Sequence, residues 1–335
     1  MCLVAFALDQ QARYPFVLAA NRDEFFNRQS ARLAWWQPED GGPAILGGRD
    51  LSAGGTWLGL TAHGRLGLVT NIRNPEDVDP QAPSRGNIVP QWLKGDVDMA
   101  TLWPRLAMSG YNGFNMIALD FAHAECFWIN NRRLYPERLQ KGIFGLSNAQ
   151  LNTPWPKVQQ LKAELKQALT GNPEVDQLAD RLMDALANPE QADDNHLPRT
   201  GVPQDWERLL SSCFIRSPDG AYGTRCSTVL ITERLHKRLV THVFERTFTP
   251  TGMALLRRVT LKNWPPRHTM AEADVARLQA SLPEVARPAS DKADKVEEAF
   301  ESSEVHEQDN HVLPALKRSR ARNLIKAPVL KLLKA

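Results

Sequence analysis

The amino-acid sequence predicts an α+β protein in which helices cover antiparallel sheets. Short apolar or alternating runs separated by short turns dominate the first half of the chain, and such connections join antiparallel neighbours. Two stretches with leucines at helical spacing follow, and further strand-like runs come after them. Strands, helices and strands again indicate layers of helix packed on antiparallel sheet.

The strands are predicted in pairs, because turn-forming residues such as Pro15 and Gly64 stand between neighbouring apolar runs. Residues 3–8 and 16–20 form the first hairpin, whose polar turn ends in Tyr14-Pro15. The other predicted pairs are residues 57–61 with 65–70, the two halves of "FNMIALDFAHAECFWIN" around Ala122-His123, and "CSTVLIT" with "RLVTHVFER".

The helices are predicted from the recurrence of apolar residues at helical spacing. The first begins at about Lys157, after Thr153 and Pro154 as start signals. The second follows Glu174 and ends before Asn188-Pro189. A third and shorter helix is expected over residues 88–93, after Ser84.

Composition narrows the class of protein. The chain of 335 residues is long enough for one large domain or two small ones, and a formal net charge of +3 argues against a dedicated nucleic-acid binder. No run approaches the roughly 18 apolar residues needed to span a bilayer. Asp9 and Arg13 break the opening apolar run too early for a signal peptide. We therefore predict a cytoplasmic protein without a transmembrane segment and without a nucleic-acid partner.

The last fifty residues differ from the rest, and we predict one domain over residues 1–285 and a flexible tail over 286–335. Residues 291–310 are mainly acidic, whereas residues 317–334 carry Lys and Arg without Asp or Glu. Such blocks of charge are typical of solvated or interacting tails. Weak contact of the basic end with a membrane or a partner is an alternative, but Pro328 would interrupt a long helix there.

The cysteines do not form a metal or disulfide pattern. Cys2, Cys126, Cys213 and Cys226 include no CxxC pair, which argues against a structural zinc site and against covalent c-type haem. Four cysteines in so long a chain are also too few for a disulfide scaffold. The histidines are scattered, so we expect no metal site.

Cys2 has two interpretations. It is either a small buried hydrophobe or, once Met1 is removed, the first residue of the chain. In the second case it carries a thiol of pKa about 8.5 and an α-amine of pKa about 8. The amine can then act as general base for the thiol of the same residue, as in an N-terminal nucleophile.

The polar cluster in "LAANRDEFF" is placed beside Cys2 by the first predicted hairpin. If residues 3–8 pair with 16–20, the far end of the second strand lies near the start of the first, which brings Asn21, Arg22 and Asp23 to Cys2. Arg22 and Asp23 could hold the α-amine and lower the pKa of the thiol. The alternative is that these residues only cap a turn.

Three further residues are candidates for the same site. Asn71 and Asn148 follow predicted strands, where an amide donor could stabilise an oxyanion, although asparagine is also common in turns. Arg225 opens an apolar strand, where a surface charge is the alternative. The stretch "GGRDLSAGGTWLG" lacks the spacing of a nucleotide-binding loop, so its glycines are expected to form tight turns.

Together, these motifs resemble those of a known family. "MCLVAF", "LAANRDEFF", "GRDLSAGGTWLGL", "TNIRNP", "SRGNIV", "YNGFNMI", "GLSNAQLNTPWPKV" and "YGTRCSTVL" resemble the NRDE family, also called the transport and Golgi organisation 2 family, from residue 1 to about 250. The resemblance implies an Ntn-hydrolase-like fold, a four-layer αββα sandwich. The family is more distantly similar to penicillin V acylase and bile salt hydrolase, which are N-terminal cysteine amidases.

This resemblance implies site roles, and it leaves two functions open. Cys2 matches the nucleophile and Arg225 a late arginine, whereas the amidase pattern R-N-x-D reads Asn-Arg-Asp-Glu here. Asn71 and Asn148 resemble two asparagines of the amidases, of which one helps to form the oxyanion hole and the other follows a later strand. The first function is Cys2-dependent hydrolysis of a small amide or acyl compound, which needs no cofactor. The second is a haem or acyl-lipid carrier that uses the same cleft. The aromatic candidates for an apolar cleft are Phe25, Phe26, Trp57 and Trp155, which could equally be core residues.

Overall fold

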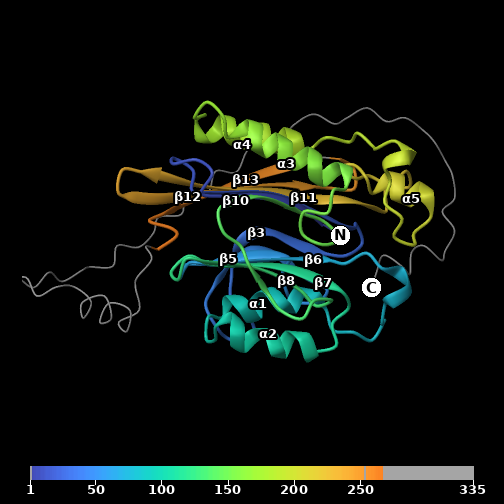
Figure 1. Ribbon diagram of the computed structural model, residues 1–335, viewed down its shortest axis with the longest axis horizontal. Helices are drawn as coiled ribbons and strands as arrows, with labels where there is room; N and C mark the ends of the chain where they lie inside the picture. Colours follow the sequence, from blue (N-terminus) through green and yellow to red (C-terminus); the bar gives the residue numbers. More distant parts are fainter. Residues whose placement is uncertain (1, 253, 267–335) are drawn as a thin grey trace, which may run out of the picture.

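The fold is built on two antiparallel sheets stacked face to face, with helices on both outer faces (Figure 1). It was obtained as a computed structural model that describes residues 2–252 and 254–266. In these residues the first sheet has six strands in the order β10-β1-β2-β11-β12-β13. Their bounds are β1 Cys2–Leu8, β2 Phe16–Phe25, β10 Gly142–Leu146, β11 Tyr222–Leu235, β12 Arg238–Phe248 and β13 Ala254–Lys262.

The second sheet is formed by the part of the chain between the two halves of the first. Over the described residues it has seven strands, which follow one another in chain order from β3 to β9. Their bounds are β3 Ser30–Trp36, β4 Ile45–Asp50, β5 Leu58–Thr61, β6 Arg65–Asn71, β7 Phe114–Asp120, β8 Glu125–Asn130 and β9 Glu137–Arg138.

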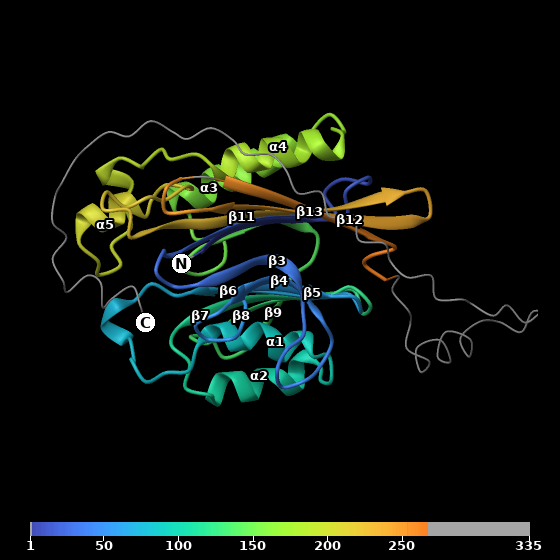
Figure 2. The ribbon, with the colours of Figure 1, turned by 180° about the vertical axis from the view of Figure 1, so that it is seen from behind.

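The helices complete a four-layer αββα sandwich, which confirms the predicted fold class. α3 and α4 lie on the outer face of the first sheet, and α1 and α2 lie on the outer face of the second (Figures 1 and 2). The short α5 lies at one end of the sandwich, against the beginning of β11. The bounds are α1 Ile88–Leu93, α2 Met99–Met108, α3 Pro156–Ala168, α4 Val175–Leu186 and α5 Gln204–Leu209, with 3-10 helices at Pro75–Asp77, Arg85–Asn87 and Asp194–His196.

The layers explain why the first strand is apolar on both faces. Val4 and Phe6 of β1 belong to the core between the two sheets, whereas Leu3 and Ala5 belong to the core under α3 and α4. Successive side chains of a strand point to opposite faces, so a strand covered on both sides needs an unbroken apolar run. Cys2 shares the face of Val4 and therefore points into the space between the sheets.

Most of the predicted elements are present. The paired strands 3–8 with 16–20, 65–70 with 58–61, and β7 with β8 form as expected, and so do the three predicted helices. Seven strands and α-helices were not predicted: β3, β4, β9, β10, β13, α2 and α5. The predicted tail, residues 286–335, lies outside the described residues, as does the proposed domain boundary at 285. No helix within residues 2–252 and 254–266 is long and apolar enough to cross a membrane.

One prediction about the second strand is wrong. The polar residues after Ala20 were expected to end the strand, but β2 continues to Phe25. They remain in the strand because β2 has a partner on each side: β1 pairs with it as far as Arg22, and β11 as far as Phe25. Buried polar side chains are tolerated when they are hydrogen-bonded, and those of Asn21 and Asp23 are.

Candidate functional site

The sheet register brings the beginning of the chain to the polar cluster of β2, as the sequence predicted. Cys2 pairs with Arg22 across β1 and β2, and Arg22 pairs on its other side with Cys226 of β11. The register of β11 shifts between Thr224 and Cys226, which places Arg225 in a bulge. The three strands therefore carry the side chains of Cys2, Arg22 and Cys226 on one face of the sheet.

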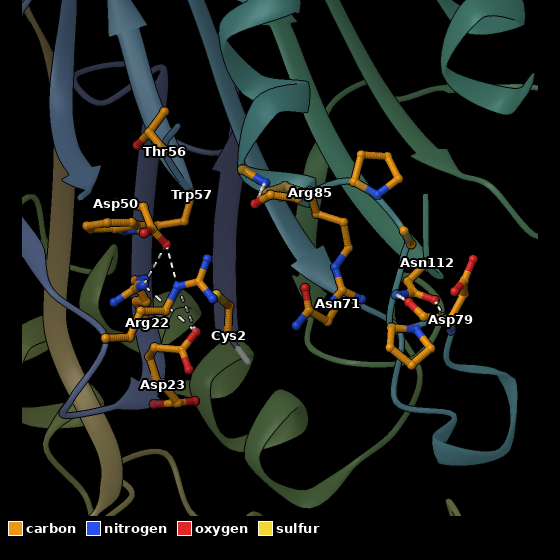
Figure 3. A pocket seen from close by; sticks show the side chains of 18 residues that line it. Cys2, Arg22, Asp23, Asp50, Thr56, Trp57, Asn71, Asp79, Arg85 and Asn112 are labelled. Atoms are coloured by element: carbon orange, nitrogen blue, oxygen red, sulfur yellow. Dashed lines mark hydrogen bonds and ion pairs between the residues drawn. The ribbon is translucent and has the colours of Figure 1, made fainter. Parts of the chain in front are cut away.

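A polar pocket of about 260 Å³ opens beside Cys2. On one side it is bounded by the beginning of β1 and the end of β2, and on the other by the loops that follow β4 and β6 (Figure 3). Its wall carries charges of both signs: Arg22, Arg28, Arg85, Asp23, Glu24, Asp50 and Asp79, joined by Cys2, Thr56, Trp57, Val69, Asn71, Pro80, Ala82, Pro83, Ser84, Gly86 and Asn112.

The Cys2 thiol is nearly enclosed, with only 7% of the residue exposed. Burial raises the pKa of this thiol, and Asp23 raises it further, while Arg22 acts in the opposite direction. Arg22 therefore acts on the thiol pKa in the expected direction, Asp23 acts against it, and burial makes the net shift upward. Desolvation disfavours the thiolate more than one nearby guanidinium favours it. A buried, protonated thiol needs a base to become a nucleophile.

Arg22 is held against the second sheet. Its guanidinium lies 4.3 Å from the ring centroid of Trp57, and its Nη2 is 3.4 Å from the Oδ2 of Asp50. Asp50 also accepts a hydrogen bond from Nε of Arg28, at 2.7 Å. The Nη1 of Arg22 is buried and forms no hydrogen bond with the described residues. The Arg22 side chain lies beside Cys2 in the pocket wall (Figure 3), so this donor is available to a bound molecule.

Asp23 approaches the start of β1 from the helix-facing side of the sheet. It shares this face with Asn21, whose amide donates to the carbonyls of Leu186 and Cys213, both at 2.8 Å. Thr224 donates to the Oδ1 of Asp23 at 2.8 Å. Burial raises the pKa of the Asp23 carboxyl, and the charge of Lys157 opposes that shift. Asn21 thus has a structural role, whereas the Asp23 carboxyl lies near the start of the chain.

Asn71 and Asn148 are neighbours but occupy different positions. Asn71 lines the pocket at the end of β6, and its side-chain amide forms no hydrogen bond with the described residues. Asn148 is buried behind it, and its Nδ2 donates to the backbone oxygen of Asn71 at 2.9 Å. The placement therefore suits Asn71 as a direct donor to a bound molecule, and it makes Asn148 a support for Asn71.

Arg225 does not belong to the pocket wall. Its Nη1 donates to the carbonyls of Phe25 and Arg28, each at 2.8 Å, and its guanidinium stacks on Phe26 at 5.0 Å from the ring centroid. It binds the turn after β2 to the bulge of β11. The predicted participation of Arg225 in catalysis gains no support from this placement.

Asp50 and Arg85 are pocket residues that were not predicted, whereas Trp57 was among the aromatic candidates for a cleft. Asp50 and Trp57 lie within the glycine-rich stretch whose glycines were expected to form turns. A Cβ at Gly55 would lie 2.2 Å from the backbone oxygen of Gly86, so this glycine permits two loops to touch. Burial lowers the pKa of Arg85 to about 10, and its side chain extends toward Asn71 (Figure 3). The glycines were the available sequence signal for this junction.

The pocket offers little to a metal or haem. Across the described residues, no group of three or more His, Cys, Asp or Glu side chains could hold a metal ion. No histidine lines the pocket, so Cys2 is the sole candidate among its wall residues for binding haem iron. The wall is dominated by charged and polar groups rather than by the apolar surface that a porphyrin would need.

Comparison with known proteins places the sequence in a family. The model of the family described as Transport and Golgi organisation 2 matches residues 1–250. The chain belongs to the Transport and Golgi organisation 2 family. The predicted resemblance is thereby confirmed, and the matched residues contain all six candidate site residues.

Relatives from this family include animal proteins. The Transport and Golgi organization protein 2 homolog of Homo sapiens is 36% identical over 252 residues, covering 70% of this chain and 89% of the relative. The corresponding homolog of Mus musculus is 34% identical over 250 residues, with the same coverage. Transport and Golgi organization protein 2 of Drosophila melanogaster is 28% identical over 270 residues, covering 74% of this chain and 93% of the relative.

Comparison with solved structures finds the N-acylethanolamine-hydrolyzing acid amidase ortholog of Caenorhabditis elegans. The two chains share 11% sequence identity and align with a TM-score of 0.39, over 69% of this chain and 92% of the amidase. At this level of similarity, no function follows for this chain.

Proposed function

We propose that the protein is a Cys2-dependent hydrolase of a small amide or acyl compound. The observation that carries the proposal is the placement of the Cys2 side chain in a polar pocket, between the pocket residues Arg22 and Asn71 (Figure 3). Both have side-chain donor atoms without a partner among the described residues. A nucleophile together with unused donors is the arrangement that acyl transfer requires.

The first step uses the α-amine that removal of Met1 would create. The thiol sulfur attacks the substrate carbonyl carbon, the S–C bond forms, and the thiol proton passes to the α-amine. This amine serves as base because the buried thiol is protonated at neutral pH and cannot supply a thiolate unaided. The carbonyl oxygen becomes an oxyanion, which the Asn71 amide and Nη1 of Arg22 are placed to receive.

The second step returns the enzyme to its starting state. The bond from the carbonyl carbon to the leaving group breaks, and the leaving group takes the proton from the α-ammonium. Water then attacks the thioester while the α-amine accepts its proton. The S–C bond breaks, the carboxylic acid leaves, and the α-ammonium returns its proton to the sulfur, which restores the thiol and the neutral amine. Ser147 donates to the backbone oxygen of Cys2 at 2.9 Å and so holds the nucleophile's main chain during these steps.

The haem or acyl-lipid carrier has less support. Of the four aromatic residues considered for an apolar cleft, Trp57 lines the pocket, where it is stacked on Arg22. Phe25 packs on Tyr222, Phe26 on Arg225 and Trp155 on Arg73. A wall that buries so many charges favours a small polar substrate over a large apolar cargo.

The test combines an intact mass with a hydrolysis screen. We expect the purified protein to lack Met1 and to hydrolyse members of a panel of acylated amines and thioesters. Cys2→Ala should reduce that hydrolysis to background, whereas Cys126→Ala, whose cysteine is also buried but lies away from the pocket, should leave it unchanged. Retained Met1, or hydrolysis that survives Cys2→Ala, would contradict the proposal.

The carrier is tested separately by haem titration. We expect no saturable Soret shift at one equivalent of haem. A defined shift that weakens in Cys2→Ala would favour the carrier over the hydrolase.

A further inference from the structure

A cluster of buried polar side chains lies behind Cys2, on the helix-facing side of the first sheet. Its residues Lys157, Asp23, Tyr222 and Glu207 come from α3, β2, β11 and α5, and Arg73 comes from the loop after β6. Its members are linked by mutual electrostatic interactions, because Asp23 acts on Lys157, Arg73 and Tyr222 alike. The Nζ of Lys157, the Nε and Nη2 of Arg73, and the OH of Tyr222 are buried and form no hydrogen bond with the described residues.

Lys157 is the most unusual residue of this cluster. It stands in the first turn of α3, and only 1% of the residue is exposed. A buried ammonium without a hydrogen-bond partner costs free energy. If position 157 had only a structural role, we would therefore expect an apolar residue there in place of lysine. Lys166, near the other end of the same helix, is exposed as a lysine usually is.

The cluster contains the carboxylates of Asp23 and Glu207, and Glu207 already has its own partners. Glu207 binds the Nη1 of Arg73 at 2.6 Å and accepts hydrogen bonds from the backbone and the hydroxyl of Thr200. Asp23 is therefore the carboxylate that balances the charge of Lys157. Burial lowers the pKa of Lys157 to about 8, and the groups that act on it electrostatically are Asp23, Arg73, Cys213 and Cys2.

We propose that Lys157 is a positioning residue for the Cys2 nucleophile, whose buried ammonium offsets the charge of Asp23 beside the α-amine of Cys2. An isolated carboxylate at this place would favour the α-ammonium, which cannot accept the thiol proton. With Lys157 charged, the field of Asp23 at the amine is partly cancelled, and the neutral amine is present near pH 7. This inference rests on the proposed function, since it assigns Lys157 a role in preparing the proposed base.

The test measures the titration of the Cys2 amine and thiol directly, without a substrate. The full chain with Cys2 as its first residue, verified by intact mass, is labelled with ¹³C at the cysteine Cβ, and the Cys2 signal is assigned with Cys2→Ser. We expect Lys157→Met to raise the lower apparent pKa of the Cys2 pair by about one unit. Lys166→Met makes the same change at the exposed position of α3 and should cause no shift.

The outcomes separate this inference from the proposed function. An unchanged titration in Lys157→Met, or an equal shift in Lys166→Met, would overturn the role of Lys157. If Lys157→Met does not fold, Asp23→Asn carries the test with the opposite sign, because loss of the carboxylate should lower the same pKa. An unshifted pKa in that variant would also overturn it. A shift as expected in a protein that hydrolyses no member of the panel would place the failure in the proposed function alone.

Discussion

The pKa of the Cys2 thiol depends more on burial than on the charged neighbours of the residue. Arg22 lies directly opposite Cys2 in the sheet, yet its guanidinium is also bound to Asp50 and stacked on Trp57. A cation that already has a carboxylate partner stabilises a second anion less. The structure therefore favours a protonated thiol that is activated by a base.

The raised pKa of Cys2 predicts slow alkylation at neutral pH. In the folded chain at pH 7.5, iodoacetamide should modify Cys2 more slowly than it modifies the same residue in urea. Since the thiolate is the reactive form, the rate should rise by about tenfold per pH unit while the pH stays below the pKa. Peptide mapping by mass spectrometry distinguishes Cys2 from the other cysteines. Equal rates at pH 7.5 in the folded and unfolded chains would contradict a raised pKa.

The strand β2 connects the candidate site to the helical layer. Its alternating faces send Arg22 toward the second sheet and Asn21 toward α4, so neighbouring residues of one motif have different roles. Asn21 binds the last carbonyl of α4, the carbonyl of Cys213, and the hydroxyl of Ser227, which donates to its Oδ1 at 2.6 Å. The first asparagine of the motif is thus a link between sheet and helix.

Replacement of Asn21 should destabilise the fold. Asn21→Ala leaves two buried carbonyls without their donor, which should lower the free energy of unfolding by about 2 kcal/mol or more. Urea denaturation followed by circular dichroism measures the change. Asn195→Ala, at an exposed position of the 3-10 helix Asp194–His196, is the matched control and should have little effect. If the two variants were equally stable, the result would contradict the role of Asn21 as a link between sheet and helix.

The two sheets are held together by an apolar core that both contribute to. Val4, Phe6 and Leu18 from the first sheet face Leu60 and Leu68 from the second. The Cys2 pocket lies at one end of this core, where polar side chains replace the apolar ones. The position of the site therefore depends on how the sheets are stacked.

A cavity in this core should weaken the whole sandwich. Leu68→Ala should lower the free energy of unfolding by about 2–5 kcal/mol, because the leucine is 1% exposed and its neighbours cannot fully close the gap. Leu51→Ala, at a residue that is 54% exposed, should change it by less than about 0.5 kcal/mol. Thermal or urea unfolding measures the free energy of unfolding of both variants. A similar loss in both variants would contradict the assigned core.

The sequence by itself determined the antiparallel pairing of the first two strands, the three helices at 88–93, 156–168 and 175–186, and the meeting of Cys2 with Arg22 and Asp23. These depend on local periodicity and on short turns, which neighbouring residues specify. Only the tertiary structure decided that Asp50 and Arg85 complete the pocket, that Asn148 stands behind Asn71, and that Lys157 lies buried beside Asp23. Such contacts join residues far apart in the chain, and burial, which sets the protonation of Cys2, exists only once the layers are packed.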